Sequence, residues 1–562
     1  MNWVAELMVK FDILGLRTLS VISDVCKQLD IKIEDIDPDD PFIYTNFKDL
    51  QRPQGLFQIE AHTNFNVCQK IAPRNLEELS AVVALARPGA LEFLDQYFTY
   101  IKTGDFQSQH ELFDDVLGYT GGIPLYQEQL MKMAVKVGFT LDEAEQLRRI
   151  VGKKKIDQMP VWKEKIKEKI AENSLDPKAG DILWKVAEDS ANYSFNKSHS
   201  LAYANLAAWT AYLKFKHPKE FFIALLKMSK YEPSPHEEIA KVSQELSHFN
   251  IRLLAPDLAR SDMDFSIEGS DIRFGLNSIK GVSGKSLQSL RDFRDSSNPN
   301  KYDIFLSAKE AGLNIGILSA LIQAGSLSEY KTRRARLVLE AQAFNILTDR
   351  EKRNFQALGS EYNWDVLETI QAVRTDNLIG DDSKLIMKDT RFETFKKKYL
   401  PYKEIYDRNK KYEKFANWYF ENKLLGYSPT IPLKDVFSET GEDLGDAEDF
   451  RKLEKDHHGR FIGVVSDYFK GVSRNGNEYI KFVIRDEVGE YPIMLMDRRC
   501  RDQYGSWSSV NVLSDFNNKN PKGPKKESII VCYGSKGDSI LFCNRFEVID
   551  EKIYMKLSDL KQ

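Results

Sequence analysis

The sequence changes its hydrophobic period between its two ends, and this change constrains the fold more than any other feature. Over most of residues 31–345, apolar residues recur at helical spacing, which predicts amphipathic helices separated by short polar breaks. From residue 460 onward, short runs of β-branched and aromatic residues alternate with turn signals such as Asn475-Gly476. We therefore predict a multidomain chain that is mainly α-helical and ends in a small C-terminal β-barrel.

Local patterns predict several individual elements. Within residues 7–14, every second residue from Leu7 to Ile13 is large and apolar, and this period of two predicts a short β-strand near the N-terminus. Thr140 and Glu143 form a capping-box pattern at the start of a helical segment that Gly152 ends. Residues 346–450 are charged and rich in aromatic residues, and their pattern favours neither helix nor strand.

Composition narrows the class of protein. The 562 residues are enough for several domains, and the formal net charge of −4 gives no global sign of nucleic-acid binding, so any polyanion contact must come from local basic patches. The five cysteines form no CxxC pair and do not cluster with the eight histidines at zinc-ligand spacing. No apolar run approaches the roughly 18 residues of a membrane span, and the N-terminus lacks a signal pattern. We predict a cytoplasmic protein without structural zinc or membrane association.

The predicted N-terminal strand places Lys10 and Asp12 on the same face. One interpretation is an exposed ion pair on a solvated strand, which contributes little to stability. The other is a carboxylate that binds a metal ion beside an ammonium group that binds phosphate. The spacing alone favours the first interpretation and leaves the second open.

A basic motif follows the predicted helix that starts after Thr140. Arg148 and Arg149 lie in the last turn of this helix, and Lys153, Lys154 and Lys155 follow its glycine stop. Cations suit a helix C-terminus, so a solvated face explains the motif. Five cations within eight residues also repel one another unless an anion lies among them, and guanidinium groups fit phosphate oxygens. Both interpretations stay open.

A second polar cluster lies at the start of a long apolar helix that ends before Pro218. Its members are Asn196, Lys197, Ser198 and His199. Free backbone N–H groups at a helix N-terminus, together with a lysine and a serine, form a cradle for an anion. His199 taken alone is more typical of a capping or packing residue.

The stretch 276–290 reads as two helices joined by a glycine turn. Lys280, Gly281, Ser283 and Lys285 lie in this turn, which is similar to a helix-hairpin-helix. Such turns present backbone N–H groups and a lysine to a DNA phosphate without reading bases. Any tight turn between helices is the alternative.

Two carboxylates that precede this turn in the sequence have the spacing of a metal site. Asp262 and Asp264 stand two residues apart, as in a paired-carboxylate site, but a hairpin pattern follows them at residues 266–275. We therefore predict a surface hairpin with solvated turn carboxylates.

Taken in order, these motifs resemble the C-terminal part of the bacterial DNA polymerase III alpha subunit, the family C replicative polymerases. The resemblance is collinear from about residue 5 to 345 and weaker beyond. The stretches that carry it include "MVKFDILGLRTLSVI", "GLFQIEA", "LEELSAVVALARPGALE", "GGIPLYQEQLMKMA", "LRRIVGKKK" and "SFNKSHSLAYANL". The resemblance implies these domains: the last palm segment (1–30), fingers (31–270), a helix-hairpin-helix region (271–345), a helical linker or clamp-binding-like region (346–455) and an OB-like barrel (456–562).

The resemblance also implies roles for single residues. Asp12 matches the third of three metal-binding aspartates, and Lys10 matches a residue near the incoming triphosphate. The nucleotide-binding set it implies is Arg148, Arg149, Lys153, Lys154, Asn196, Lys197, Ser198 and His199, with His199 near the sugar. The turn Lys280, Gly281, Ser283 and Lys285 would hold duplex DNA, although Ser283 replaces the usual second glycine.

The implied reaction adds dNTPs to a primer 3′ end on a DNA template, with two Mg²⁺ ions at the reacting phosphate. One aspartate cannot hold two such ions. No motif here matches the family's other two aspartates, its PHP domain, its first palm segment or its thumb. We therefore expect the C-terminal subunit of a split polymerase, of bacterial or viral origin, that needs a second polypeptide carrying those parts. Use of a sliding clamp stays open, and a non-catalytic DNA-binding accessory protein or relic is the alternative function.

Overall fold

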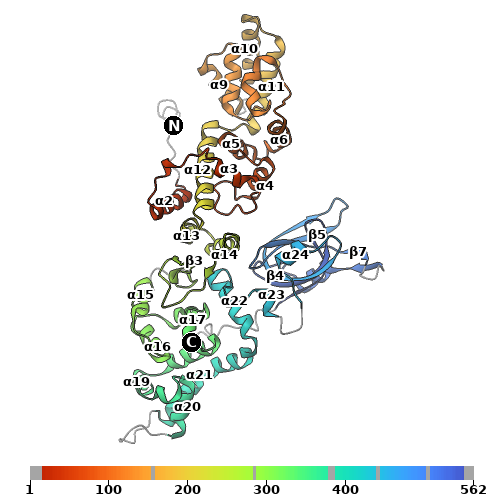
Figure 1. Cartoon of the computed structure of the whole chain (residues 1–562). Helices are drawn as coiled ribbons and strands as arrows, with labels where there is room; N and C mark the ends of the chain where they lie inside the picture. The colour runs from red at the N-terminus through yellow and green to blue at the C-terminus, as the bar shows by residue number, and fades with distance from the viewer. Residues whose placement is uncertain are drawn as a thin grey trace. The chain divides into compact units, whose positions relative to one another are not determined.

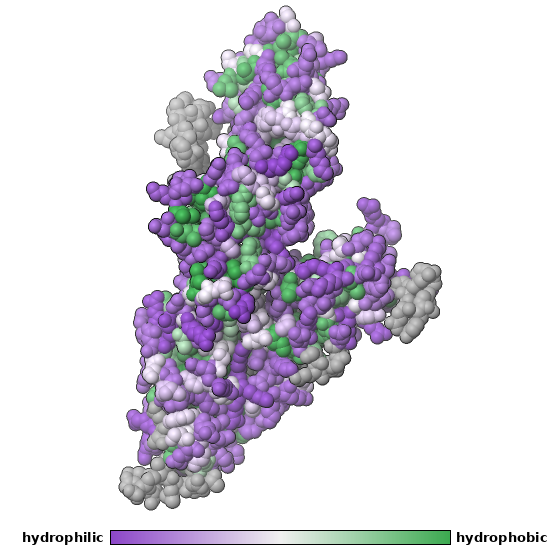
Figure 2. All heavy atoms as spheres, viewed as in Figure 1, coloured by the Kyte–Doolittle hydropathy of each residue, from purple (hydrophilic) through white to green (hydrophobic). Residues whose placement is uncertain are grey.

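The computed structural model describes residues 15–152, 158–282, 286–376, 387–437, 443–501 and 507–549. The chain divides into two compact units, Met1–Met228 and Ser229–Gln562. Figure 1 shows helices throughout the first unit, and helices followed by a barrel in the second. Hydrophilic side chains cover most of the visible surface of each unit and leave only small apolar patches (Figure 2).

The first unit contains a helical group built around α12 (Lys197–Lys216). Alanines on α12, including Ala204, Ala207 and Ala208, are fully buried, and such small side chains let α5 approach closely. The other helices of this group are α2 (Arg17–Leu29), α3 (Pro41–Lys48), α4 (His62–Ile71), α5 (Leu76–Leu85), α6 (Leu94–Thr103) and α13 (Pro218–Met228).

A second helical group of this unit has its own core, in which Leu147, Leu183 and Trp162 are buried. Thr140 N donates to Glu143 Oε2 at 2.8 Å and Glu143 N donates to Thr140 Oγ1 at 3.3 Å, so the predicted capping box is confirmed. The helices are α7 (Asp114–Leu117), α8 (Gln127–Val137), α9 (Leu141–Gly152), α10 (Met159–Glu172) and α11 (Pro177–Tyr193). Helices α9, α10 and α11 gather at one end of the unit (Figure 1).

The second unit begins with α14 (Pro235–Leu246) and a small three-stranded sheet. Its strands are β1 (Leu253–Leu254), β2 (Ser266–Glu268) and β3 (Asp271–Arg273), with β3 parallel to β1 and antiparallel to β2. The β2–β3 hairpin forms as predicted, but the prediction that it lies at the surface is wrong for β3, because all three of its residues are buried.

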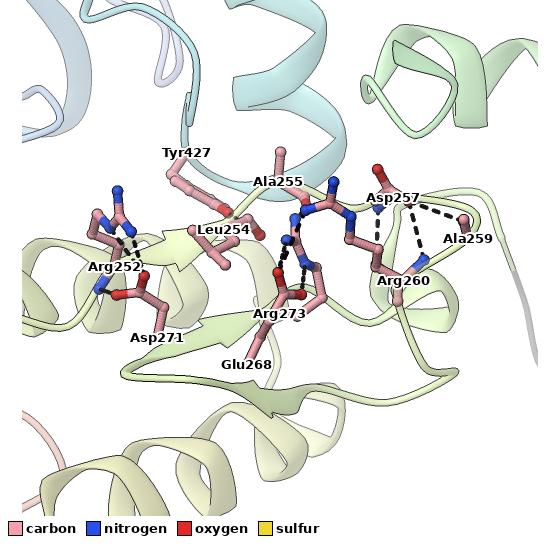
Figure 3. A network of polar contacts seen from close by, with 11 residues as sticks. Arg252, Leu254, Ala255, Asp257, Ala259, Arg260, Glu268, Asp271, Arg273 and Tyr427 are labelled. Atoms are coloured by element: carbon pink, nitrogen blue, oxygen red, sulfur yellow. Dashed lines mark hydrogen bonds and ion pairs between the residues drawn. The ribbon is translucent and has the colours of Figure 1, made fainter. Parts of the chain in front are cut away.

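Buried Arg273 fastens the β2–β3 hairpin to the loop between β1 and β2 (Figure 3). Its guanidinium donates to Glu268 at 2.6 and 2.7 Å and to the Ala255 carbonyl at 2.6 Å. The Asp262 carboxylate lies 3.5 Å from Arg294, and the Asp264 carboxylate lies 3.9 Å from Lys230. The two aspartates therefore face different cations.

The segment 346–450, whose pattern favoured neither helix nor strand, forms a series of helices joined by short turns and loops in its described residues. Its buried Glu421, on α22, forms an ion pair with Arg334 and accepts the Ser428 hydroxyl at 2.8 Å. The helices between the small sheet and the barrel are α15 (Leu287–Asp295), α16 (Lys301–Glu310), α17 (Ile315–Gln323), α18 (Arg334–Ile346), α19 (Asp349–Leu358), α20 (Val366–Asp376), α21 (Asp389–Asn409), α22 (Glu413–Leu425), α23 (Leu433–Val436) and α24 (Ala447–Lys452). Across the described ranges, no helix combines the length and the apolar character needed to cross a membrane.

The predicted C-terminal barrel is confirmed. Five strands close in the order β10-β6-β5-β4-β9, and every pair is antiparallel except β10 with β6. A helix, α25 (Val512–Lys519), lies between β6 and β9 in the chain, and this connectivity is that of an OB barrel. The strands are β4 (His458–Val472), β5 (Glu478–Arg485), β6 (Glu490–Leu495), β9 (Ile529–Lys536) and β10 (Leu541–Val548), with a side hairpin of β7 (Arg498–Arg501) and β8 (Trp507–Val510).

Two adjacent buried carboxyl groups, Asp486 and Glu487, fasten the barrel to the helices before it. Glu487 accepts the Trp418 indole N–H at 2.5 Å and the Leu433 amide at 3.1 Å. Asp486 accepts the Ala447 amide at 2.6 Å, and burial raises its pKa to about 7. Burial also raises the pKa of Glu487.

The raised pKa of Asp486 predicts how stability depends on pH. An unfolded aspartate has a pKa of about 3.9, so between pH about 4 and about 7 the folded chain binds a proton that the unfolded chain releases. The free energy of unfolding therefore falls as pH rises through this window. Asp486→Asn cannot titrate, and we expect its unfolding free energy to change less steeply with pH, by about 1–4 kcal/mol over the window.

Denaturant unfolding at several pH values measures how steeply the unfolding free energy changes with pH in the wild type and in Asp486→Asn. Glu340 contributes to this dependence equally in the two proteins. Burial raises the pKa of Glu340 to about 7 as well, so it titrates in both proteins. Equal slopes for the wild type and Asp486→Asn would contradict the assignment to Asp486.

Candidate anion-binding site at two paired helix N-termini

A short parallel bridge between Tyr126 and Phe195 organises the candidate site. Phe195 N donates to the Leu125 carbonyl at 2.9 Å, and Gln127 N donates to the Phe195 carbonyl at 2.8 Å. Helix α8 begins at Gln127 and α12 begins at Lys197, just after the bridge on each side. The bridge therefore sets two helix N-termini side by side, and both carry N–H groups without intrahelical partners and the positive end of a helix dipole.

Asn196 caps α12. Its Oδ1 accepts the His199 amide at 2.8 Å and the Ser198 hydroxyl at 2.6 Å. The exposed His199 ring packs on Tyr203, with ring centroids 4.1 Å apart. Three of the predicted residues thus lie together at the exposed start of α12.

Lys197 joins the two helix N-termini. Its backbone N–H donates to Glu128 Oε2, in the first turn of α8, at 2.9 Å. Its ammonium group lies 3.3 Å from Glu77 and 4.6 Å from the centre of the Tyr119 ring. Its side chain is 26% exposed, so the charge is held in place and still reaches solvent.

Arg148 approaches the same place from α9. It makes two hydrogen bonds to Glu145, at 2.6 and 2.7 Å, and its Nη1 donates to the Gln127 side chain at 3.1 Å. Arg149 donates to Glu145 at 2.6 Å, and these guanidinium groups lower the pKa of Glu145 to about 2. Glu145 therefore stays ionised between the two arginines.

Gln127 and Glu128 connect the two predicted basic clusters, because one contacts Arg148 and the other contacts Lys197. The sequence reasoning assigned neither residue to the site. The available signal was their position at the start of a helical pattern in "PLYQEQLMKMA", but a helix start does not say which distant residue it meets.

Arg87 is a further residue that the sequence reasoning missed. It follows the end of α5 and is exposed, and its guanidinium lies 4.0 Å from the centre of the Phe195 ring. A cation over an aromatic face is attracted to the ring. The contact therefore adds a positive charge beside the residue that forms the bridge.

The cations of the site are held by carboxylates that partly face solvent. Glu145 is 29% exposed and Glu77 is 58% exposed. Phosphate oxygens accept the same charge-assisted hydrogen bonds as carboxylate oxygens. An anion with several phosphate groups can therefore exchange with these carboxylates without moving the helices that carry the cations.

The other predicted site residues do not join this cluster. Lys10, Asp12, Lys153, Lys154, Ser283 and Lys285 lie outside the described residues. Lys280 and Gly281 lie in the second unit, where Lys280 N donates to the Leu424 carbonyl at 2.9 Å and Gly281 has φ +90°. The described residues contain no group of three or more His, Cys, Asp or Glu side chains able to hold a metal ion.

Two regions of the chain, one in each unit, match models of known protein families. Residues 18–174 match the family model of the bacterial DNA polymerase III alpha subunit finger domain, and residues 250–337 match that of a helix-hairpin-helix motif. The chain is 32% identical over 348 residues to the DNA polymerase III subunit alpha of Thermus aquaticus, covering 59% of this chain and 28% of the relative. For the Thermotoga maritima protein of the same name, identity is 31% over 392 residues, covering 68% and 42%. For the Campylobacter jejuni protein it is 28% over 532 residues, covering 91% and 41%.

The fold and these matches define the class: a multidomain protein with polymerase-type fingers, a helix-hairpin-helix region and a terminal barrel. The chain is related to the bacterial DNA polymerase III alpha subunit and corresponds to part of it, which confirms the resemblance carried by its motifs. It spans less than half the length of each relative described above.

The bridge can be tested at Gln127. This residue is the first of α8, where a proline is accepted, and the extended backbone of Tyr126 (φ −113°, ψ 143°) suits a residue before proline. Gln127→Pro removes the donor to Phe195, whereas Gln127→Ala keeps it and loses only the side-chain contact with Arg148. We expect faster hydrogen exchange at the Phe195 amide in Gln127→Pro, by about fivefold for a bond of about 1 kcal/mol.

Gln127→Ala is the matched control, and exchange at Phe195 should stay near the wild-type rate in it. Equal exchange in the two variants would show that the bridge does not hold the two helix N-termini together.

Proposed function

We propose that this chain forms the fingers side of a replicative DNA polymerase that adds dNTPs to a primer 3′ end on a DNA template. One observation carries the proposal: Arg148 and Lys197, on different helices, converge through Gln127 and Glu128 at the paired starts of α8 and α12. Similarity to DNA polymerase III alpha subunits supports a polymerase family, and the activity of the whole protein is our proposal.

In this proposal the triphosphate of the incoming nucleotide replaces carboxylates at the cations. Arg148 would exchange Glu145 for phosphate oxygens, and Lys197 would exchange Glu77. Arg149, which is 66% exposed and shares Glu145, would add a second guanidinium to the phosphate chain. Lys153 and Lys154 would extend the same basic motif, as the resemblance implies.

Ser198 and His199 would contact the nucleotide away from its phosphates. The exposed ring of His199 is held against Tyr203, so it offers a fixed flat surface for the sugar. Asn196 caps the helix, and its main role would be to position Ser198 and His199 rather than to contact the nucleotide.

The second unit would bind DNA. At Gly281 an added Cβ would meet no atom within 4 Å, so the turn that contains Lys280 and Gly281 leaves room for a phosphate close to the backbone. On the barrel, Phe469 is 60% exposed and lies 6.2 Å from Tyr479, which suits stacking of single-stranded bases. Ser283 and Lys285 would complete the turn.

The described residues do not form a Mg²⁺ site, because their acidic groups at the candidate site pair with arginines and lysines. We therefore assign no chemical step through a metal ion to them. That Asp12 binds metal beside Lys10 stays a prediction. A second prediction is that most ligands of the two Mg²⁺ ions are further palm carboxylates. These carboxylates would lie outside this sequence, on a second polypeptide. A cytoplasmic location is likewise proposed.

Primer extension tests the need for a second polypeptide. We expect no synthesis by this chain alone, synthesis with a polypeptide that carries the thumb and the remaining palm, and loss of that synthesis in Asp12→Ala. Robust extension by the isolated chain would overturn the partner proposal. Duplex binding without extension under every combination would instead support the alternative of a non-catalytic DNA-binding protein.

Arg148→Ala tests the nucleotide site in the same assay. Losing a charged hydrogen bond costs about 1.5–3 kcal/mol, so we expect kcat/KM for the dNTP to fall by about tenfold or more. Duplex affinity should change little. Lys167→Ala, which removes an exposed cation paired with Glu164 on α10, is the control and should leave kcat/KM unchanged. Equal losses of duplex binding and of kcat/KM in Arg148→Ala would contradict the assigned role.

A further inference from the structure

A cavity in the second unit lies apart from the residues assigned above. It has a volume of about 460 Å³ and is lined by residues of α16, α18 and α19, among them Tyr302, Phe344, Lys309, Lys352 and Arg353. Helices α16 and α19 lie next to each other (Figure 1), and an ion pair between Lys309 and Asp349 joins them. Cavities of a few hundred Å³ accept small molecules.

Lys352 is the unusual residue of this cavity. It is only 6% exposed, and its ammonium group lies 5.2 Å from the centre of the Phe344 ring. Among the described residues, no carboxylate forms an ion pair with this ammonium group, and the like charge of Lys309 lies close to it. A partly buried ammonium beside a like charge and without an ion-pair partner is costly, so a charge of opposite sign is expected in the space it faces.

The nearby carboxylates are engaged elsewhere. Asp349 pairs with Lys309, and Glu351 accepts hydrogen bonds from the Thr348 amide at 2.8 Å and from Arg391 at 3.0 Å. Burial, and then the charge of Lys309, lowers the pKa of Lys352, and these effects outweigh the nearby carboxylates of Asp349 and Glu351, which raise it.

The charges on the cavity wall indicate the ligand. Lys309, Lys352 and Arg353 supply three cations against the two carboxylates of Glu310 and Asp349. The remaining positive charge and the several N–H donors suit the oxygens of a phosphate group. The aromatic rings of Tyr302 and Phe344, in edge contact with centroids 5.7 Å apart, form an apolar wall beside the cations.

We propose that this cavity binds a phosphate group of a small phosphorylated molecule, with Lys352 as its buried counter-ion and Lys309 and Arg353 at its mouth. The site is separate from the Lys280–Gly281 turn, because its walls come from α16, α18 and α19. A phosphate of the DNA backbone has the same chemistry, and the experiment separates the two sources.

The test compares the full-length chain with Lys352→Met, which keeps the length of the side chain and removes its charge. In phosphate-free buffer, we expect Lys352→Met to have a higher thermal midpoint than the wild type, because a buried unpaired charge is gone. Inorganic phosphate, added at constant ionic strength, should raise the wild-type midpoint more than that of the variant. Calorimetric titration with phosphate should detect one site fewer in the variant.

Lys397→Met, which removes an exposed lysine on α21, is the matched control and should respond to phosphate like the wild type. Lys309→Met keeps Lys352 and should weaken phosphate binding severalfold. The proposal is overturned if Lys352→Met has the lower midpoint in phosphate-free buffer, or if its response to phosphate equals that of the wild type.

A duplex DNA titration distinguishes the source of the phosphate. We expect Lys352→Met to bind duplex DNA as the wild type does. A severalfold loss of duplex affinity in this variant would overturn the small-molecule assignment and give the cavity to the DNA backbone.

Discussion

The parallel bridge between Tyr126 and Phe195 is the constraint on which the candidate site of the first unit depends. Two backbone hydrogen bonds hold segments that are far apart in the sequence, and a helix starts directly after each segment. Because the segments run in the same direction, both helices present the same positive end. Gln127 then meets Arg148, Glu128 meets Lys197, and Arg87 covers Phe195. Without the bridge, these residues would still lie on different helices, but the two helix N-termini would not be held side by side.

The two proposed binding sites differ in whether carboxylates already pair with their cations. At the paired helix N-termini, Glu145 and Glu77 hold Arg148 and Lys197 in partly exposed ion pairs that a phosphate can replace. In the cavity beside α19, Lys352 is buried without such a partner. The first arrangement suits a substrate that enters and leaves at every cycle. The second suits a ligand that supplies the missing charge itself.

The second unit depends on buried carboxyl groups of another kind. Asp486 and Glu487 accept hydrogen bonds from the Trp418 indole and the amides of Leu433 and Ala447, so buried and partly buried hydrogen bonds hold the barrel to the helices before it. The cost of burying these carboxyl groups appears as raised pKa values. An attachment of this kind keeps the barrel in a fixed relation to α22 and α23.

The sequence by itself determined the local elements of this protein and the family it resembles. The Thr140–Glu143 capping box, the Asn475-Gly476 turn between β4 and β5, and the barrel strands follow from interactions between residues close in the chain, and patterns record such interactions well. The tertiary structure alone decided which distant residues meet: Gln127 with Arg148, Glu128 with Lys197, and the burial of β3 that the surface-hairpin prediction missed. The physical reason is that a helical or strand period shows which face of an element is apolar, but not which other element covers that face or which charge lies opposite.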